Sequence, residues 1–305
     1  MGRFGTVVTA MVTPFDEGGG LDVDGAVTLA RHLVDAGSDG LVVAGTTGEG
    51  PVLTDQEKID LWRAVAGAVS VPVVAGTGTN DTAHSIALTQ AAEETGVQGV
   101  LVVTPYYNRP SQSGLSAHFR AVAGATDLPV ILYDIPVRTG RRIATDLLIE
   151  LGNTVGNIVG VKDSTADPVS AARVVAETPD HFELYSGDDP LTLPLMAVGA
   201  VGIVSVAAHW AAPLFVEMVS AFQSGDLAGA REANARLFES YQFESSDAFP
   251  NPMPAKAACR AIGLPAGQCR LPHEVAPSSL DEHARQVVAR VGRATSGASV
   301  RESIG

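Results

Sequence analysis

Lysine is nearly missing from this sequence of 305 residues. Lys58, Lys162 and Lys256 are the only three lysines, and arginine provides the remainder of the 20 basic residues. Positive charge as a whole is also scarce, because 34 acidic residues leave a formal net charge of −14. This balance argues against nucleic acid or a membrane surface as a partner, and any anionic substrate must meet local positive charge.

Several signatures of known site types are missing as well. Cys259 and Cys269 are the only cysteines, and their spacing fits no metal or redox motif. The seven histidines form no HxH or HExxH pair, and no glycine-rich phosphate loop opens a helix. No apolar run approaches the roughly 18 residues that cross a bilayer, and strand-like sequence begins at once without a secretory signal. We therefore expect a cytoplasmic globular protein with reduced thiols, no metal and no cofactor.

What the sequence does contain is a regular alternation of short apolar runs with amphipathic helical segments. The runs begin near Val7, Leu41, Val71, Val100, Pro129, Ile158, Phe182 and Gly202. A helical segment follows each run, the last of them predicted from Pro213 to Phe222. Alternating units imply a parallel sheet, and eight units in about 220 residues predict a (β/α)₈ TIM barrel. An open doubly wound sheet is the alternative, although it gives no reason for the count to stop there.

The region after the eighth unit is predicted to be a helical appendage packed on the barrel. Its helices are expected at 226–241, 254–262 and 280–291. We accordingly divide the chain into a catalytic barrel domain, residues 1–224, and a C-terminal helical region, residues 225–305. The small polar residues from Ala294 onward are typical of a frayed terminus.

The sixth strand contains one of the three lysines. The run from Ile158 to Asp163 (IVGVKD) predicts a buried strand, and simple alternation places Ile158, Gly160 and Lys162 on one face. An ammonium group in a strand-lined core costs several kcal/mol unless it is paired or deprotonated. A desolvated lysine of this kind forms Schiff bases with carbonyl substrates. The alternative is a lysine at a strand end that reaches out to water.

Polar side chains follow several of the predicted strands. They are Thr46, Thr47, Tyr106, Tyr107, Tyr133, Lys162 and Ser186, the last followed by Gly187. In a (β/α)₈ barrel the reacting groups lie at the carboxyl ends of strands, so these side chains are expected to meet at one rim. Their convergence favours a catalytic Lys162. Taken alone, Tyr133 is more typical of a core tyrosine and the two threonines of a turn.

A set of motifs occurs in an order that resembles one enzyme family. The motifs are GTTGE at 45–49, YYNRP at 106–110, IPVRTG at 135–140, GVKD at 160–163, SGDD at 186–189 and NPMP at 251–254. Together with Tyr133 they resemble the 4-hydroxy-tetrahydrodipicolinate synthases, also called dihydrodipicolinate synthases, from about Thr6 to about Val291. Other Schiff-base pyruvate lyases share the GxTGE turn and the strand lysine. The double tyrosine and the IPxRTG motif favour the synthase.

The resemblance implies a reaction that belongs to diaminopimelate and lysine biosynthesis. Lys162 is expected to form a Schiff base with pyruvate, and the derived enamine attacks the aldehyde of L-aspartate-4-semialdehyde to give 4-hydroxy-tetrahydrodipicolinate. Tyr133 is implied as the acid–base phenol. Thr46 and Tyr107, the latter from a neighbouring subunit, complete a proton relay that works through hydrogen bonds. A homotetramer built from tight dimers is implied as well.

Substrate-binding roles follow from the same resemblance. Thr47 is expected to hold the pyruvate carboxylate and Arg138 the carboxylate of the semialdehyde, with further substrate contacts at Gly187 and Ile203. A planar guanidinium suits bidentate binding of a carboxylate, and it supplies the local positive charge that the acidic chain requires. Taken alone, Arg138 is more typical of a solvated surface arginine.

Two other functions stay open at this point. A different Schiff-base pyruvate lyase or dehydratase, acting on a 2-keto sugar acid, would keep Lys162, Tyr133 and Thr47 but have less use for Arg138 and Tyr107. A non-catalytic barrel serving as a binding scaffold would show decay in this residue set, which the sequence does not.

Feedback inhibition by lysine is expected to be weak or absent. In the lysine-sensitive enzymes that the sequence resembles, a tyrosine, an asparagine, a glutamate and histidines hold the effector. Tyr106 and Asn80 match the first two, whereas His84 stands at the glutamate position and Asp55 and Lys58 at the histidine positions. Lys58 brings a like charge toward the effector's amines, and Asp55 is expected to face solvent.

Overall fold

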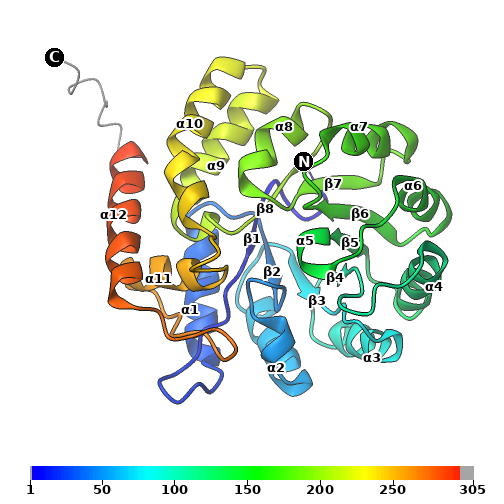
Figure 1. Cartoon of the computed structure of the whole chain (residues 1–305), viewed down its shortest axis with the longest axis horizontal. Coiled ribbons are helices and arrows are strands. Elements are labelled where there is room, and N and C mark those ends of the chain that lie inside the picture. The colour runs from blue at the N-terminus through cyan, green and yellow to red at the C-terminus, as the bar shows by residue number, and fades with distance from the viewer. Residues whose placement is uncertain (1, 296–305) are drawn as a thin grey trace.

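The computed structural model describes residues 2–295 and forms a closed barrel of eight parallel strands surrounded by helices (Figure 1). Each strand pairs with the next in sequence, and β8 pairs with β1 to close the sheet. The strands are β1 (Val7–Ala10), β2 (Gly40–Val43), β3 (Val73–Gly76), β4 (Gly99–Val103), β5 (Val130–Asp134), β6 (Ile158–Asp163), β7 (Glu183–Ser186) and β8 (Gly202–Ser205). The predicted (β/α)₈ barrel is confirmed, and the open doubly wound sheet is wrong.

A helix or a pair of helices follows each strand, and three more helices end the described chain. They are α1 (Val23–Asp35), α2 (Asp55–Ala66), α3 (Thr82–Glu93), α4 (Gln112–Ala123), α5 (Pro136–Thr139), α6 (Thr145–Thr154), α7 (Pro168–Glu177), α8 (Thr192–Met196), α9 (Ala208–Gln223), α10 (Leu227–Phe243), α11 (Met253–Ala261) and α12 (Ser278–Thr295). Asp and Ser side chains cap several of these helices, and α2 begins with the capping box of Thr54 and Glu57. No helix within residues 2–295 is long and apolar enough to cross a membrane.

Two hydrophobic cores lie on opposite sides of the strands. The inner core fills the barrel with residues such as Val42, Val74 and Leu101, whereas the outer core packs residues such as Val43 and Val73 against the helices. Alternating side chains along each strand divide between the two cores. The barrel is therefore filled below its C-terminal rim.

Strand β6 departs from simple alternation. A bulge in its register with β5 leaves Val159 without a pairing partner. A bulge adds one residue to a strand and so shifts the alternation of its side chains by one position. Ile158 packs in the outer core, and Val159 packs in the inner core. The prediction that Ile158 shares a face with Lys162 is therefore wrong.

Helix α9 begins at Ala208, so the predicted start at Pro213 is wrong. That prediction rested on the preference of proline for the first helical turn. The residues before Pro213 are already helical, and Ala211 takes a non-helical conformation (φ −128°, ψ 15°) beside the proline. A kink at this position lets the helix continue although proline disrupts its hydrogen-bond ladder.

The C-terminal helices pack on one side of the barrel, beside α9 (Figure 1). Both α10 and α12 contact α9, and α11 contacts both α9 and α12. The predicted domain boundary at residue 224 falls between α9 and α10, and apolar side chains of both helices belong to the same core. The division into two domains stays a prediction. Helix α12 extends to Thr295, and the remainder of the predicted frayed terminus lies outside the described residues.

Candidate active site

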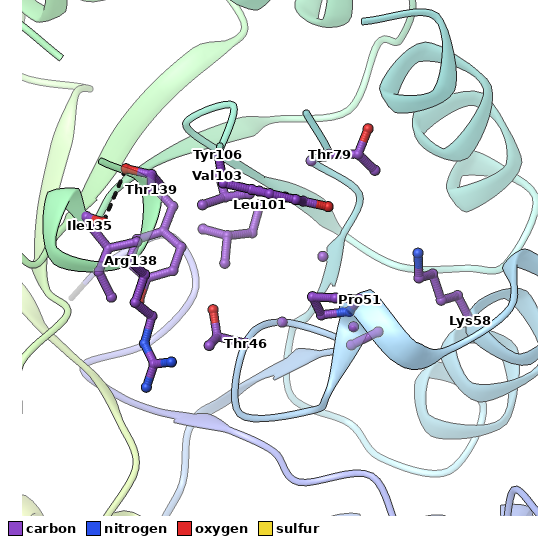
Figure 2. A pocket seen from close by; sticks show the side chains of 16 residues that line it. Thr46, Pro51, Lys58, Thr79, Leu101, Val103, Tyr106, Ile135, Arg138 and Thr139 are labelled. Carbon is purple, nitrogen blue, oxygen red and sulfur yellow. Dashed lines mark hydrogen bonds between the residues drawn. The ribbon is translucent and has the colours of Figure 1, made fainter. Parts of the chain in front are cut away.

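A cavity of about 350 Å³ opens at the C-terminal rim of the barrel. Thr46, Tyr133 and Arg138 line one part of it, and Lys58 and Thr79 line another. Figure 2 shows Arg138 and Thr46 across the cavity from Lys58, with Tyr106 near the middle. The side chains come from strand β5 and from loops and helices that follow several different strands, as expected for the reactive end of such a barrel.

Lys162 and Tyr133 are brought together in this rim. They are direct partners in the register of β6 and β5, and the Lys162 Nζ lies 4.3 Å from the centre of the Tyr133 ring. Both side chains are buried, at 5% and 4% exposure. The structure thus contradicts a Lys162 that reaches out to water, and it places a phenol directly beside the amine.

Gly187 leaves the room that the Lys162 side chain occupies. A Cβ atom at Gly187 would lie 2.9 Å from the Lys162 Cγ and 3.0 Å from its Cε, which is too close for a side chain. The next residue, Asp188, has a carboxyl pKa raised by burial and by Asp189, with the nearby Lys162 ammonium acting in the opposite direction. The Asp188 carboxyl therefore lies near Lys162, just after strand β7.

Two buried carboxyls stand behind the Lys162–Tyr133 pair. Asp134 and Asp163 follow these two residues on the same strands and are themselves register partners. The pKa of Asp134 is raised to about 7, chiefly by burial; a hydrogen bond from the Ile143 N–H lowers it, and the neighbouring Asp163 carboxyl raises it. Neither acid was among the predicted site residues, although each directly follows one of them.

The turn of residues 45–50, between β2 and α2, is held by the chain's own C-terminal region. Glu49 takes a left-handed conformation (φ 56°), and its carboxylate lies 2.6 Å from the Lys256 Nζ. The main-chain N–H of Arg270 donates to the same carboxylate at 2.9 Å. Burial lowers the pKa of Lys256, and Glu49 opposes this effect. Lys256 was not a predicted site residue, and its rarity as a lysine is the only signal in the sequence that singles it out.

Thr47 and Arg138 both contact Asn251, which lies just before α11. The Asn251 Nδ2 donates a hydrogen bond to the Thr47 Oγ1 at 2.9 Å. The Arg138 Nη2 donates to the Asn251 carbonyl oxygen at 3.4 Å. Thr47 is buried, whereas Arg138 is exposed at the rim. Asn251 belongs to the NPMP motif, but no contact with either residue was predicted for it.

The loop of residues 106–109 is far less enclosed. Tyr107 is 90% exposed and has a left-handed backbone (φ 72°). Tyr106 is half-buried and lines the cavity, and burial raises the pKa of its phenol. A single chain therefore brings Thr46 and Tyr133 to the same cavity but does not bury Tyr107 there.

Ile203 occupies a different environment from the other candidate residues. Its side chain is fully buried in the outer core, on the helix side of β8. Its main-chain N–H donates to the Thr6 carbonyl at 2.9 Å. Any substrate contact at this position would have to come from the remaining main-chain atoms.

Lys58, Asp55 and His84 form a small polar group beyond the cavity's Lys58 end. The His84 Nε2 lies 2.9 Å and 3.0 Å from the two carboxylate oxygens of Asp55, and the Lys58 Nζ lies 3.9 Å from the nearer of them. Asp55 is 55% exposed, yet it also contacts both basic residues. Burial lowers the pKa of Lys58, opposed by Asp55. Within residues 2–295, no group of three histidine, cysteine or acidic side chains could hold a metal ion.

Comparisons with known proteins agree with the motifs. Residues 3–291 match the model of the dihydrodipicolinate synthetase family. The 4-hydroxy-tetrahydrodipicolinate synthase of Moorella thermoacetica is 52% identical over 272 residues, which are 88% of this chain and 92% of that protein. The Bacillus subtilis synthase is 45% identical over 284 residues, 92% of this chain and 96% of that protein.

Solved structures of the same kind superimpose closely. Dihydrodipicolinate synthase from Bacillus anthracis matches with a TM-score of 0.91 and 43% identity over 95% of this chain and 99% of that chain. The enzyme from Cyanidioschyzon merolae, solved with lysine bound, matches with a TM-score of 0.92 and 41% identity over 96% and 99% of the two chains. The similarity extends over the whole barrel and the C-terminal helices.

Proposed function

The chain belongs to the dihydrodipicolinate synthetase family, and from this premise we propose how its residues carry out the reaction. It is a lyase of the Schiff-base aldolase type, a 4-hydroxy-tetrahydrodipicolinate synthase. It condenses pyruvate with L-aspartate-4-semialdehyde in the diaminopimelate and lysine pathway. The non-catalytic scaffold and the 2-keto sugar acid lyase are set aside on this ground.

Lys162 is the proposed nucleophile. Its amine adds to the keto carbon of pyruvate, water leaves, and a protonated Schiff base forms. Loss of a proton from the methyl group gives an enamine, whose carbon attacks the aldehyde and forms the new carbon–carbon bond. No cofactor beyond this covalent adduct is needed. The observation that carries the proposal is the buried contact of the Lys162 Nζ with the Tyr133 ring, at 4.3 Å from its centre.

Tyr133 is the proposed acid–base group. Its phenol lines the cavity beside Lys162 and can give a proton to the departing water and to the aldehyde oxygen as the bond forms. Thr46 lines the same cavity and extends a hydroxyl relay away from Tyr133. Tyr107 of a neighbouring subunit completes the relay in this proposal, in keeping with its 90% exposure on its own chain.

The two substrate carboxylates have separate proposed binding groups. The Thr47 hydroxyl holds the carboxylate of pyruvate, beside Gly187, which leaves space along Lys162. Arg138, exposed at the rim, holds the carboxylate of the semialdehyde through its guanidinium. Ile203 contributes through its main chain, because its side chain packs toward the helices. A cytoplasmic homotetramer, made as a dimer of dimers, is the proposed form of the enzyme.

Borohydride reduction in the presence of pyruvate tests the nucleophile. We expect one covalently attached pyruvyl group per chain, located by peptide mapping at Lys162. The Lys162→Ala chain should gain none, although it keeps Lys58 and Lys256 as internal controls. Labelling at either of those lysines, or no labelling of the unsubstituted enzyme, would refute the assignment. Product formation with the semialdehyde, followed in a coupled assay, separates the synthase from a lyase of 2-keto sugar acids.

A further inference from the structure

We infer that Asn251 is a positioning residue, which sets the Thr47 hydroxyl to donate its hydrogen to a bound carboxylate. The inference rests on the proposed function, in which Thr47 holds the carboxylate of pyruvate. Asn251 and Thr47 are buried at 7% and 3% exposure, and the Asn251 Nδ2 lies 2.9 Å from the Thr47 Oγ1. The contact joins the C-terminal region to the 45–50 turn inside the protein.

The direction of this hydrogen bond determines what Thr47 can do. A threonine hydroxyl has one hydrogen to donate and two lone pairs to accept with, whereas an ionised carboxylate only accepts. The Asn251 amide donates, so it occupies a lone pair of Thr47 and leaves the hydroxyl hydrogen for another acceptor. Within residues 2–295, this is the one hydrogen bond that the Thr47 side chain makes. The Thr47 hydroxyl hydrogen is therefore free to be donated to the carboxylate of pyruvate.

The opposite orientation of the Asn251 amide would reverse the effect. Its Oδ1 would then accept the Thr47 hydrogen, and the hydroxyl could offer only a lone pair to the substrate. In the orientation that the structure has, the buried Oδ1 lacks a partner within the described residues. An aspartate at this position can only accept when ionised, so Asn251→Asp imposes the reversed arrangement without changing the size of the side chain.

Asn251 contacts the second carboxylate-binding residue through a different atom. Its main-chain carbonyl accepts the hydrogen bond from the Arg138 guanidinium. A substitution of the side chain removes the Thr47 contact but leaves a main-chain carbonyl in place. Side-chain variants should therefore affect pyruvate and spare the semialdehyde, which a general loss of folding would not do.

The experiment measures kcat/KM for each substrate, because the Schiff base forms before the semialdehyde reacts and each value reports its own half-reaction. Asn251→Ala should lower kcat/KM for pyruvate about tenfold, the scale of one lost hydrogen bond. Asn251→Asp should lower it about a hundredfold, because it takes the hydroxyl hydrogen and repels the substrate carboxylate. Neither should change kcat/KM for the semialdehyde by more than about twofold, since the main chain is retained.

Ser246→Ala is the matched control. The Ser246 hydroxyl accepts the Phe249 N–H at 3.0 Å in the loop before Asn251 and has no contact with Thr47. It should leave both values unchanged. If Asn251→Ala does not fold, Asn251→Ser provides the same measurement with a hydroxyl too short to reach Thr47. Equal losses for both substrates, or Asn251→Asp no worse than Asn251→Ala, would overturn the inference.

A double-substitution cycle separates this inference from the role of Thr47 itself. Thr47→Val removes the hydroxyl at nearly constant shape and should lower kcat/KM for pyruvate. Adding Asn251→Ala should then cause no further loss, since a positioning residue acts only through the group that it positions. Independent losses that multiply would refute the positioning role while leaving Thr47 in place. An unaffected Thr47→Val enzyme would instead refute the proposed binding role of Thr47, and the inference with it.

Discussion

The 45–50 turn and the 106–109 loop both follow strands at the same end of the barrel, yet they are held in opposite ways. The turn is enclosed by the chain's own C-terminal region, and Glu49 and Lys256 are 1% and 0% exposed in their ion pair. The loop presents Tyr107 to solvent at 90% exposure. One chain therefore encloses the Lys162 side of the site, whereas it leaves the Tyr107 side open to solvent.

This difference explains why a barrel enzyme keeps helices beyond its eighth unit. Asn251, Lys256 and Arg270 all come from the C-terminal region, and all three contact the 45–50 turn. Catalytic groups must be held close to their productive geometry by neighbours that are themselves fixed. Helix α11, which contains Lys256, and the segments on either side of it provide that support for the turn. By the same reasoning, we expect the 106–109 loop to gain its support from the neighbouring subunit proposed above.

The largest effect is expected from breaking the enclosed turn at Lys256. Lys256→Met leaves the Glu49 carboxylate buried without its ion-pair partner, which typically costs about 3–5 kcal/mol of unfolding free energy. Denaturant unfolding at one fixed protein concentration measures the loss. Arg285→Met is the control, because its pair with Glu282 is exposed and such pairs contribute about 0–1 kcal/mol.

A partner variant tests whether the loss comes from the stranded charge. Glu49→Gln combined with Lys256→Met removes both charges, so it should recover a large part of the stability. A Lys256→Met enzyme as stable as the Arg285→Met control would show that the buried pair does not hold the turn. The 45–50 turn would then not differ from the 106–109 loop through the Glu49–Lys256 ion pair.

The second prediction concerns the open loop. Tyr107→Phe should lower kcat about a hundredfold, because proton transfer by a positioned group contributes at least that much. A hybrid of Tyr107→Phe chains with Lys162→Ala chains should regain activity after subunit exchange. Some hybrid sites then combine an intact Lys162 with an intact Tyr107 from the neighbouring chain. No recovery despite demonstrated exchange would mean that each chain uses its own Tyr107.

For the Lys162 side of the site, the sequence predicted where the strands and the key residues lie. It did not predict which distant residues contact them. Periodic apolar runs located all eight strands, and scarcity of lysine singled out Lys162. The β6 bulge was missed because local patterns do not show how one strand registers against another. The kink before Pro213 was missed because a proline inside a helix looks locally like one in a first helical turn. Asn251 and Lys256 were missed as supports because they contact a turn about two hundred residues earlier, and no periodicity encodes such a pairing.

The third prediction concerns the buried carboxyls behind the enclosed half. Folding raises the pKa of Asp134 from 3.8 to about 7, so the folded protein binds the proton more tightly than the unfolded chain. Stability is then fully present below the unfolded pKa and falls as pH rises toward the folded pKa. Between about pH 5.5 and pH 6.5 the loss from this group approaches about 1.4 kcal/mol.

Asp134→Asn removes this titration and keeps an oxygen for the Ile143 N–H, which Asp134 accepts at 3.2 Å. The variant should lose less stability than the unsubstituted enzyme across that pH interval, as measured by denaturant midpoints at each pH. Parallel curves for the two proteins would show that Asp134 does not titrate there. The predicted fall in unfolding free energy due to Asp134 would then be absent.

The smallest effect is expected from free lysine, at the Lys58 end of the cavity that Tyr106 of the open loop also lines. A glutamate that held an effector amine would be replaced here by His84, which instead lies 2.9 Å from Asp55. Losing a charge-assisted hydrogen bond costs roughly 1.5–3 kcal/mol, and the buried Lys58 ammonium adds like-charge repulsion. Together these effects should weaken lysine binding by roughly ten- to a few-hundredfold.

Initial rates measured with lysine up to tens of millimolar test this expectation. The unsubstituted enzyme should show little inhibition, and His84→Glu combined with Lys58→His should become more sensitive because a carboxylate replaces a base and the buried ammonium is removed. The Asp55 carboxylate works against the prediction, since it could attract an effector amine, but His84 and Lys58 already share it at 2.9 Å and 3.9 Å. Asp55→Asn in the same assay measures that contribution. Sub-millimolar inhibition of the unsubstituted enzyme would show that the Lys58 ammonium does not keep lysine out of this end of the cavity.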